Sequence, residues 1–471
     1  MRSSRTSSNS TTTTDNAVAD EQQTSTESTT ESTTITPVAA NSTAQITAVN
    51  ASASKSASAN ADPITTLLNA IQNSFAGAGL LIRRSFFNEA PRVTPVQLTG
   101  ETTGAITGNV GATDPEGDHL VYKVTQDGHY GTVTVDAQGN YTYTPTAGGQ
   151  CDDGTCVDSF VVSATDTGPH INLLNWFRTA STSAAEGVYQ GNAHKITYTF
   201  TYGNGSQFWS SAARAELAAT AIYLSSYFEP QHDVDITYTV TGQYSLMGGT
   251  LASAGSDLIS DNGFATTVVQ NKILTGADSN EAAADGTIDW NFGYGWGYGA
   301  TVPGGSYDFQ STAMHELLHT FGFISVVDRA GNNTVDNWTD FDSFITTSNG
   351  TTVFNGDTFN PAYNTNLTGG NGGLYFGGEN AKAANNGNPV PLYTPNPWES
   401  GSSMSHLDDD TYTGTAEKLM NAASNTGLGV RELSAIEIGI MRDLGYTMVS
   451  QSTGAAVLLL GFMLVRRRKQ Q

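Results

Sequence analysis

The chain has 471 residues, with 20 Lys and Arg against 44 Asp and Glu, so its formal net charge is −24. This charge argues against binding to nucleic acid or anionic membranes, because phosphate contacts need clustered Lys and Arg side chains. It fits a soluble secreted protein, which a high net charge keeps dispersed. The length allows two or more domains, each with its own core.

The N-terminal part predicts a polar segment followed by a helix. Residues 1–62 are dominated by Ser, Thr, Ala and Asn. Such a segment cannot bury enough apolar surface to offset chain entropy, so we expect it to be disordered. No secretory signal peptide is recognisable, because no apolar core follows Met1. Residues 63–88 place apolar side chains at helical spacing and predict a linker helix.

Residues 89–168 change to a two-residue period and predict a small antiparallel β-sandwich. The alternating segments cover residues 105–110, 119–124, 131–135, 141–144 and 159–164. The pattern resembles the cadherin-like modules of bacterial surface proteins. The turn Asp114–Asp118 could hold calcium, but an exposed turn is the simpler interpretation. We expect an accessory module, because the candidate catalytic residues lie outside it.

Cys151 and Cys156 are the only cysteines of the chain and stand close together before the last of these strands. No second pair or nearby His completes a zinc tetrahedron, so a local disulfide is expected. A disulfide favours an oxidising compartment outside the cytoplasm.

Residues 169–448 predict an α+β domain. The expected elements are strands at 194–200, 234–240 and 263–271, an Ala-rich helix at 210–226, and a final helix whose capping box is Ser434 and Glu437. We also expect the segment 287–301 to line a substrate cleft as an edge strand, to which an extended peptide could add.

The segment His315-Glu316-Leu317-Leu318-His319 has the spacing HExxH. Apolar residues at helical spacing around it, and Gly322 after it, predict a buried helix. Two histidines one turn apart on a helix can bind zinc as neutral nitrogen ligands. Glu316 would then act as a general base on a zinc-bound water. The alternative is a pair of core histidines without a metal.

A catalytic zinc site needs a third protein ligand and an open fourth position. Ser325 occupies the position where the spacing HExxHxxGxxH would place a third histidine, and His406 is the only histidine after the motif. It stands in a Ser-His segment that is followed by Leu419 and Met420. Rival third ligands are the loop aspartates Asp328, Asp336, Asp340 and Asp342.

Together these residues resemble the leishmanolysin-like branch of the metzincins and related bacterial secreted metallopeptidases. In that branch a long insertion separates an HExxHxxGF helix from a Ser-His segment and a Leu-Met turn. The resemblance covers about residues 170–448 and implies an α+β metzincin domain. It also implies zinc ligands His315, His319 and His406, general base Glu316, and Met420 beneath the metal. Departures are the absence of Pro after Ala422 and a long spacing from His406 to Met420.

Residues 449–471 form an apolar tail with a basic end. The apolar run 454–465 is short for a stable span, which needs about 20 residues. The Arg-rich end resembles the C-terminal sorting tails of bacterial surface proteins, although no LPxTG-type motif precedes it. We therefore expect a bacterial protein outside the cell or at its surface, with transient membrane anchoring.

The expected function is that of a secreted or cell-surface zinc endopeptidase, which cleaves protein or peptide substrates through a zinc-bound water activated by Glu316. One alternative is a surface adhesion protein with a structural or inactive metal site. Another is a zinc hydrolase that acts on a non-peptide bond. A structural site would add a fourth Cys or His, and the sequence offers no good candidate.

Overall fold

The computed structural model describes residues 63–152, 154–167, 180–191, 194–245 and 249–449. The predicted polar segment 1–62 and the apolar run of the tail lie outside the described residues. Helix α1 (Pro63–Phe86) matches the helix predicted there. Contacts divide the chain within α1, so that residues 6–79 form one unit and the described residues from Leu80 onward form another. In the described part of the chain, no helix is long and apolar enough to cross a membrane.

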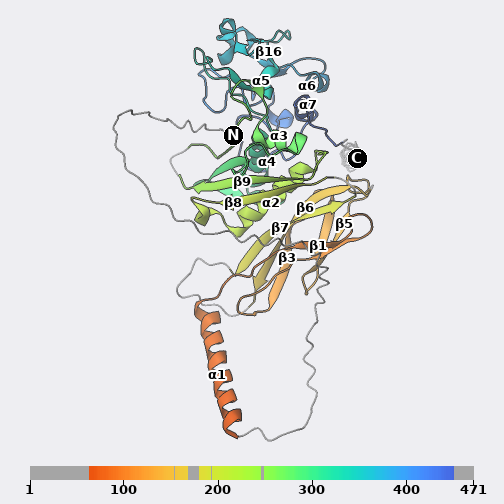
Figure 1. Ribbon diagram of the computed structural model, residues 1–471, viewed down its shortest axis with the longest axis vertical. Helices are drawn as coiled ribbons and strands as arrows, with labels where there is room; N and C mark the ends of the chain where they lie inside the picture. Colours follow the sequence, from red (N-terminus) through yellow and green to blue (C-terminus); the bar gives the residue numbers. More distant parts are fainter. Residues whose placement is uncertain (1–62, 153, 168–179, 192–193, 246–248, 450–471) are drawn as a thin grey trace, which may run out of the picture. The chain divides into compact units, whose positions relative to one another are not determined.

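The predicted β-sandwich is present as two antiparallel sheets (Figure 1). One sheet has the order β1-β2-β5-β4, with β1 at Val96–Thr99, β2 at Ile106–Asn109, β4 at Gly131–Val135 and β5 at Asn140–Pro145. The other has the order β3-β6-β7, with β3 at Leu120–Gln126, β6 at Cys156–Asp166 and β7 at Ser181–Gln190. Ile106, Tyr141 and Phe160 are fully buried between the sheets. The predicted disulfide between Cys151 and Cys156 is confirmed.

A strand beyond the predicted end of the sandwich at residue 168, β7, adds to one of its sheets. β7 pairs with β6 over the whole strand, from Ser181 opposite Thr165 to Gln190 opposite Cys156. The strand is rich in Ser, Ala and Gly, since small side chains are needed where this sheet packs on a helix. Such a sequence gives only a weak alternating signal.

The described residues after the sandwich, from His194 onward, are called the second part. Its largest sheet has the order β10-β12-β9-β8, with β8 at Ile196–Tyr202, β9 at Val234–Gln243, β10 at Ala252–Gly255 and β12 at Gly286–Asn291. β8, β9 and β12 run parallel, and β10 pairs antiparallel with β12. The expectation that 287–301 supplies an edge strand is therefore wrong, because β12 has neighbours on both sides. The edge strands are β10 and β8, and the small side chains of β10 gave no strong strand pattern.

Helix α2 (Ser211–Ser225) lies between the two parts and is buried on both sides. Ala215 and Ala219 pack against Val161 of β6, whereas Leu217 and Leu224 belong to the main core of the second part. Ser159 Oγ donates to the carbonyl of Ala219 at 2.7 Å. An Ala-rich helix fits here because small side chains allow close approach of a sheet.

A loop of the sandwich makes further contacts with the second part. The ring of His129 stacks on Tyr223 of α2 with a centroid distance of 3.5 Å, and its Nε2 lies 2.8 Å from Nε2 of Gln310. Tyr130 and Gln150 contact Ser226 at the end of α2. These polar contacts and the buried alanines join the sandwich closely to the second part, and the expectation of an accessory module did not include such contacts.

The remaining elements surround the helix that carries HExxH, α4 (Phe309–Thr320). The other helices are α3 at Val268–Thr275, α5 at Asp340–Ser343, α6 at Glu379–Ala384 and α7 at Ala435–Asp443. Short strand pairs are β11 (Gly263–Ala265) with β15 (Asn337–Thr339), β13 (Trp296–Gly297) with β14 (Tyr307–Asp308), and β17 (Phe354–Asn355) with β18 (Thr358–Phe359). A three-stranded sheet joins β16 (Ile345–Thr346), β19 (Tyr375–Phe376) and β20 (Val390–Pro391). This part therefore combines helices with several small sheets, and its predicted assignment to an α+β metzincin domain stays a prediction.

The acidic turn Asp114–Asp118 is not simply exposed. Arg83 Nε lies 2.9 Å from a Glu116 carboxylate oxygen, and Arg84 Nε lies 2.8 Å from Asp118. The Glu116 side chain is fully buried. The guanidinium groups of two arginines thus balance the negative charge of this turn. Among the described residues, the turn is not one of the clusters that could hold a metal ion.

We predict that the sandwich is needed for the second part to fold. A chain that begins at residue 170 loses β1 to β6 and exposes the alanine face of α2, whereas a chain that begins at Leu80 keeps the contacts between the sandwich and α2. The longer chain should unfold in one cooperative transition, and the shorter one should aggregate or melt at least about 10 °C lower. Circular dichroism on heating measures this. Equal melting temperatures would show that the sandwich is an independent module.

Candidate metal centre

Helix α4 carries His315, Glu316 and His319, and all of its residues are buried. Its N-cap is Asp308, whose carboxylate accepts a hydrogen bond from the backbone of Ser311 at 3.2 Å. Arg431 donates to both oxygens of the same carboxylate, at 2.7 and 2.9 Å. A negatively charged cap at the N-terminus stabilises the start of a helix. Arg431, which lies outside α4, therefore helps to hold the first turn of the helix in place.

A chain of buried polar contacts links this helix start to the sandwich. With its amide oriented to satisfy both groups, Gln126 of β3 donates to Glu216 of α2 at 2.7 Å. The backbone N–H of Gly299 donates to the other oxygen of Glu216 at 3.3 Å, and the carbonyl of Gly299 accepts from Arg431 at 2.9 Å. Arg431 holds Asp308, so the chain of contacts runs from the sandwich to the N-cap of α4.

Three imidazoles converge on one point. Nε2 of His315 lies 3.0 Å from Nε2 of His406 and 3.0 Å from Nε2 of His319. Each ring makes a second contact through Nδ1, which donates to a backbone carbonyl: Leu419 at 2.8 Å, Phe323 at 2.8 Å and Ser402 at 2.7 Å for His315, His319 and His406. These contacts fix the tautomer, because the proton sits on Nδ1 and the lone pair on Nε2.

This donor set fits a zinc ion. Burial lowers the pKa of His319 to about 4 and holds the pKa values of His315 and His406 well below 6.5. The rings are therefore neutral at physiological pH, the form in which imidazole binds a metal. Three neutral nitrogen lone pairs facing each other at this distance repel one another unless a cation lies between them. In the described part of the chain, these three histidines are the metal-compatible cluster.

Gly322 ends the helix and sets the position of His319. Its φ is +99°, and a Cβ at this position would come within 2.4 Å of the side-chain oxygen of Gln270. Any larger residue would therefore be strained and would clash. The turn places the carbonyl of Phe323 against the ring of His319, which explains why the glycine follows the motif.

The Leu419-Met420 segment lies directly against the histidines. The carbonyl of Leu419 orients His315, and Met420 is fully buried. The backbone N–H of Met420 donates to Glu437 at 2.8 Å, and its carbonyl accepts from Leu407 at 2.9 Å. Glu437 was predicted only as part of the α7 capping box, which is present. No sequence pattern predicts the hydrogen bond between Glu437 and the backbone of Met420, because only the fold brings these two residues together.

Glu316 is buried beside the three histidines, and no described residue makes a hydrogen bond of normal geometry to either carboxylate oxygen. Burial raises its pKa to about 8, and the nearby backbone of Ala254 in β10 opposes this shift. Burial makes the charged form of a carboxyl group costly, so burial by itself favours the neutral form of Glu316. A cation at the histidines would favour the charged form.

The rival aspartates do not join this cluster. Asp342 is the most buried of them, and it accepts hydrogen bonds from Ser325 Oγ at 2.6 Å and from the backbone of Thr339 at 3.1 Å. It therefore holds the loop that follows α4. The structure brings together His315, His319 and His406, and leaves Asp328, Asp336, Asp340 and Asp342 outside.

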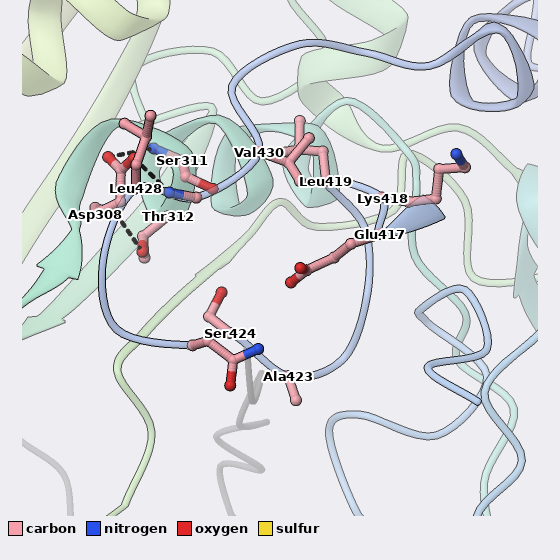
Figure 2. A pocket seen from close by; sticks show the side chains of 12 residues that line it. Asp308, Ser311, Thr312, Glu417, Lys418, Leu419, Ala423, Ser424, Leu428 and Val430 are labelled. Carbon is pink, nitrogen blue, oxygen red and sulfur yellow. Dashed lines mark hydrogen bonds between the residues drawn. The ribbon is translucent and has the colours of Figure 1, made fainter. Parts of the chain in front are cut away.

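Two cavities adjoin the segment that follows Met420. The larger has a volume of about 210 Å³ and extends from Leu251, just before β10, to Ala422. The smaller, of about 40 Å³, lies beside the first turn of α4. Figure 2 shows Glu417 and Ser424 directed toward this smaller cavity, whereas Lys418 extends away from it. One water needs roughly 10–15 Å³, so the smaller cavity holds about three waters and the larger one can take a side chain.

We predict that His406 is required for metal binding. The substitution His406→Ala removes one of three nitrogen ligands and should lower zinc affinity by more than about 100-fold. The matched control is His232→Ala, because His232 is exposed and far from the site in sequence. Zinc content after dialysis against a weak chelator measures the effect. Unchanged zinc in the His406 variant would contradict the ligand set.

Comparison with known proteins identifies only the sandwich. Residues 88–171 match the family of bacterial Ig domains, which typically occur in surface or extracellular proteins. No curated protein and no solved structure matches the chain. The metzincin resemblance of residues 169–448 therefore stays a prediction. The module that we likened to cadherin-like domains is, by this match, a bacterial Ig domain.

Proposed function

We propose that the chain is a secreted or cell-surface zinc endopeptidase. The observation that supports the proposal is the convergence of three neutral imidazoles, two from helix α4 and one from the loop that carries His406, together with the buried carboxyl group of Glu316 on α4. Zinc bound there would polarise a water molecule and the carbonyl of a scissile peptide bond. The bacterial Ig domain and the disulfide support a place outside the cytoplasm.

The chain's own groups would then perform the acid–base chemistry. Glu316 accepts a proton from the attacking water, and delivers it to the amine that leaves when the peptide bond breaks. Leu419, Phe323 and Ser402 keep the imidazoles oriented through their carbonyls. Edge strand β10 offers backbone groups to which an extended substrate could add as a further strand.

The ligand count favours a catalytic over a structural site. Structural zinc sites have four protein ligands, and catalytic sites have three and an open position. Among the described residues, no fourth His, Cys, Asp or Glu joins the three histidines, and both cysteines of the chain are bonded to each other in the sandwich. This argues against an adhesion protein with a purely structural metal.

We predict that Glu316→Ala separates metal binding from catalysis. The variant keeps all three histidines and should bind zinc like the unmodified protein, while proteolysis falls by about 10²–10⁴-fold, as expected for the loss of a general base. Zinc content and cleavage of an unfolded protein such as reduced casein are the two measurements. Near-normal cleavage by this variant would refute the proposed role of Glu316, and loss of zinc would show that Glu316 is itself a ligand.

A further inference from the structure

Residues 429–437, here called the connecting segment, contact the surroundings of the metal centre at two places. Gly429 and Arg431 contact Asp308, the N-cap of the helix that carries two of the three histidines. Glu437 contacts the Leu419-Met420 turn, whose first carbonyl orients His315. Neither contact takes part in the proposed acid–base chemistry, so the connecting segment has a role still to be assigned.

At its first end, the connecting segment holds the carboxylate of Asp308. Arg431 donates through Nε at 2.7 Å and through Nη2 at 2.9 Å, and the backbone N–H of Gly429 donates at 2.9 Å. The ion pair is little exposed, with 14% of the Arg431 side chain and 2% of the Asp308 side chain accessible. A bidentate arginine–carboxylate contact fixes orientation as well as distance. It therefore fixes how the start of α4 lies against this segment.

Gly429 allows this contact because its backbone lies against the first turn of α4. A Cβ at position 429 would come within 2.6 Å of Ser311 Oγ and 2.8 Å of Ser311 Cβ. The smaller cavity, of about 40 Å³, lies between the first turn of α4 and the chain from Leu419 to Val430 (Figure 2). Because the cavity interrupts the packing there, the contacts at its two ends decide how this stretch lies on α4.

At its other end, the connecting segment holds the Leu419-Met420 turn through Glu437. One carboxylate oxygen of Glu437 accepts from the backbone N–H of Ser434 at 2.7 Å and completes the capping box of α7. The other oxygen accepts from the backbone N–H of Met420 at 2.8 Å. Glu437 is fully buried. One side chain thus joins the start of α7 to the turn that orients His315.

His315 lies between the two ends. Its backbone belongs to α4, whose start is held by Arg431, and its Nδ1 donates to the carbonyl of Leu419 at 2.8 Å. Such a hydrogen bond needs heavy-atom distances of about 2.7–3.2 Å. A shift of α4 relative to the turn would therefore weaken this bond and release the ring. Loss of a group that orients a metal-bound histidine typically lowers metal affinity by about 10–100-fold.

We propose that Arg431 is a positioning residue of the metal centre, which holds Asp308 so that His315 meets the carbonyl of Leu419, while Glu437 completes the link from the other end. Arg431 acts through these contacts and transfers no proton. The proposal rests on the zinc centre of the proposed function, but it does not depend on which bond that centre cleaves.

Zinc affinity of the folded protein separates a positioning role from support of the fold alone. We expect Arg431→Gln to weaken zinc binding about tenfold and to lower kcat with little change in KM. Arg431→Lys keeps a cation beside Asp308 without the bidentate contact, and should lose roughly threefold. The matched control is Arg442→Gln, because Arg442 is exposed on α7, and its zinc affinity should be unchanged. Competition with a chelator measures affinity, and circular dichroism of the zinc-free proteins verifies folding.

A double substitution tests whether the two ends act as one unit. Glu437→Gln replaces one acceptor oxygen by a donor and should weaken zinc binding to a degree similar to Arg431→Gln. The double variant should bind zinc little more weakly than either single variant, since each change alone already releases His315 from Leu419. A loss equal to the product of the two single losses would show independent effects and overturn the proposal.

Unchanged zinc affinity in folded Arg431→Gln protein, whatever its melting temperature, would also overturn the positioning role and leave the peptidase function standing. If that variant does not fold, Arg431→Lys decides, and full zinc affinity in it would count against the proposal. Zinc binding that depends on Arg431 and Glu437 as one unit, in a protein that cleaves no peptide, would support the positioning role and refute the peptidase. A protein that binds no zinc would refute both.

Discussion

The Nδ1 proton of each imidazole is donated to a backbone carbonyl, and this contact decides where the opposite nitrogen points. The three carbonyls belong to separate segments, namely the turn after α4, the loop before His406 and the Leu419-Met420 turn. Two of these segments depend on a further residue: Gly322 allows the turn after α4, and Glu437 anchors the Leu419-Met420 turn. The metal centre therefore depends on contacts between parts that are far apart in the sequence.

The bacterial Ig domain shares this dependence. Its sheet covers one side of α2, and the contacts from Gln126 through Glu216 and Arg431 end at the N-cap of α4. A helix covered on both sides has no solvent face, which explains why α2 lacks the usual amphipathic pattern. Separation of the domain from the second part would leave buried polar groups without partners, a change that costs more than the loss of ordinary surface contacts.

Sequence patterns predicted the elements with strong local signals and missed those defined by their neighbours. The HExxH helix, the capping box of α7 and the five alternating strands were found, because periodicity and caps are local properties. β7 and β10 were missed, since their small side chains are explained only by close packing against α2 and α4. The segment 263–271 was predicted as a strand, but Thr267 and Gln270 form a capping box that starts α3. His406 could be singled out only because histidines are scarce, and Arg431 gave no signal.

The central claim is an open zinc site with three imidazole ligands, and X-ray absorption at the zinc edge of the purified, zinc-loaded protein tests it most directly. We expect three nitrogen ligands at about 2.0–2.1 Å with imidazole multiple-scattering features, and one further light atom in the fourth position. A sulfur ligand at about 2.3 Å, a fourth imidazole, or six oxygen ligands would contradict the proposed centre.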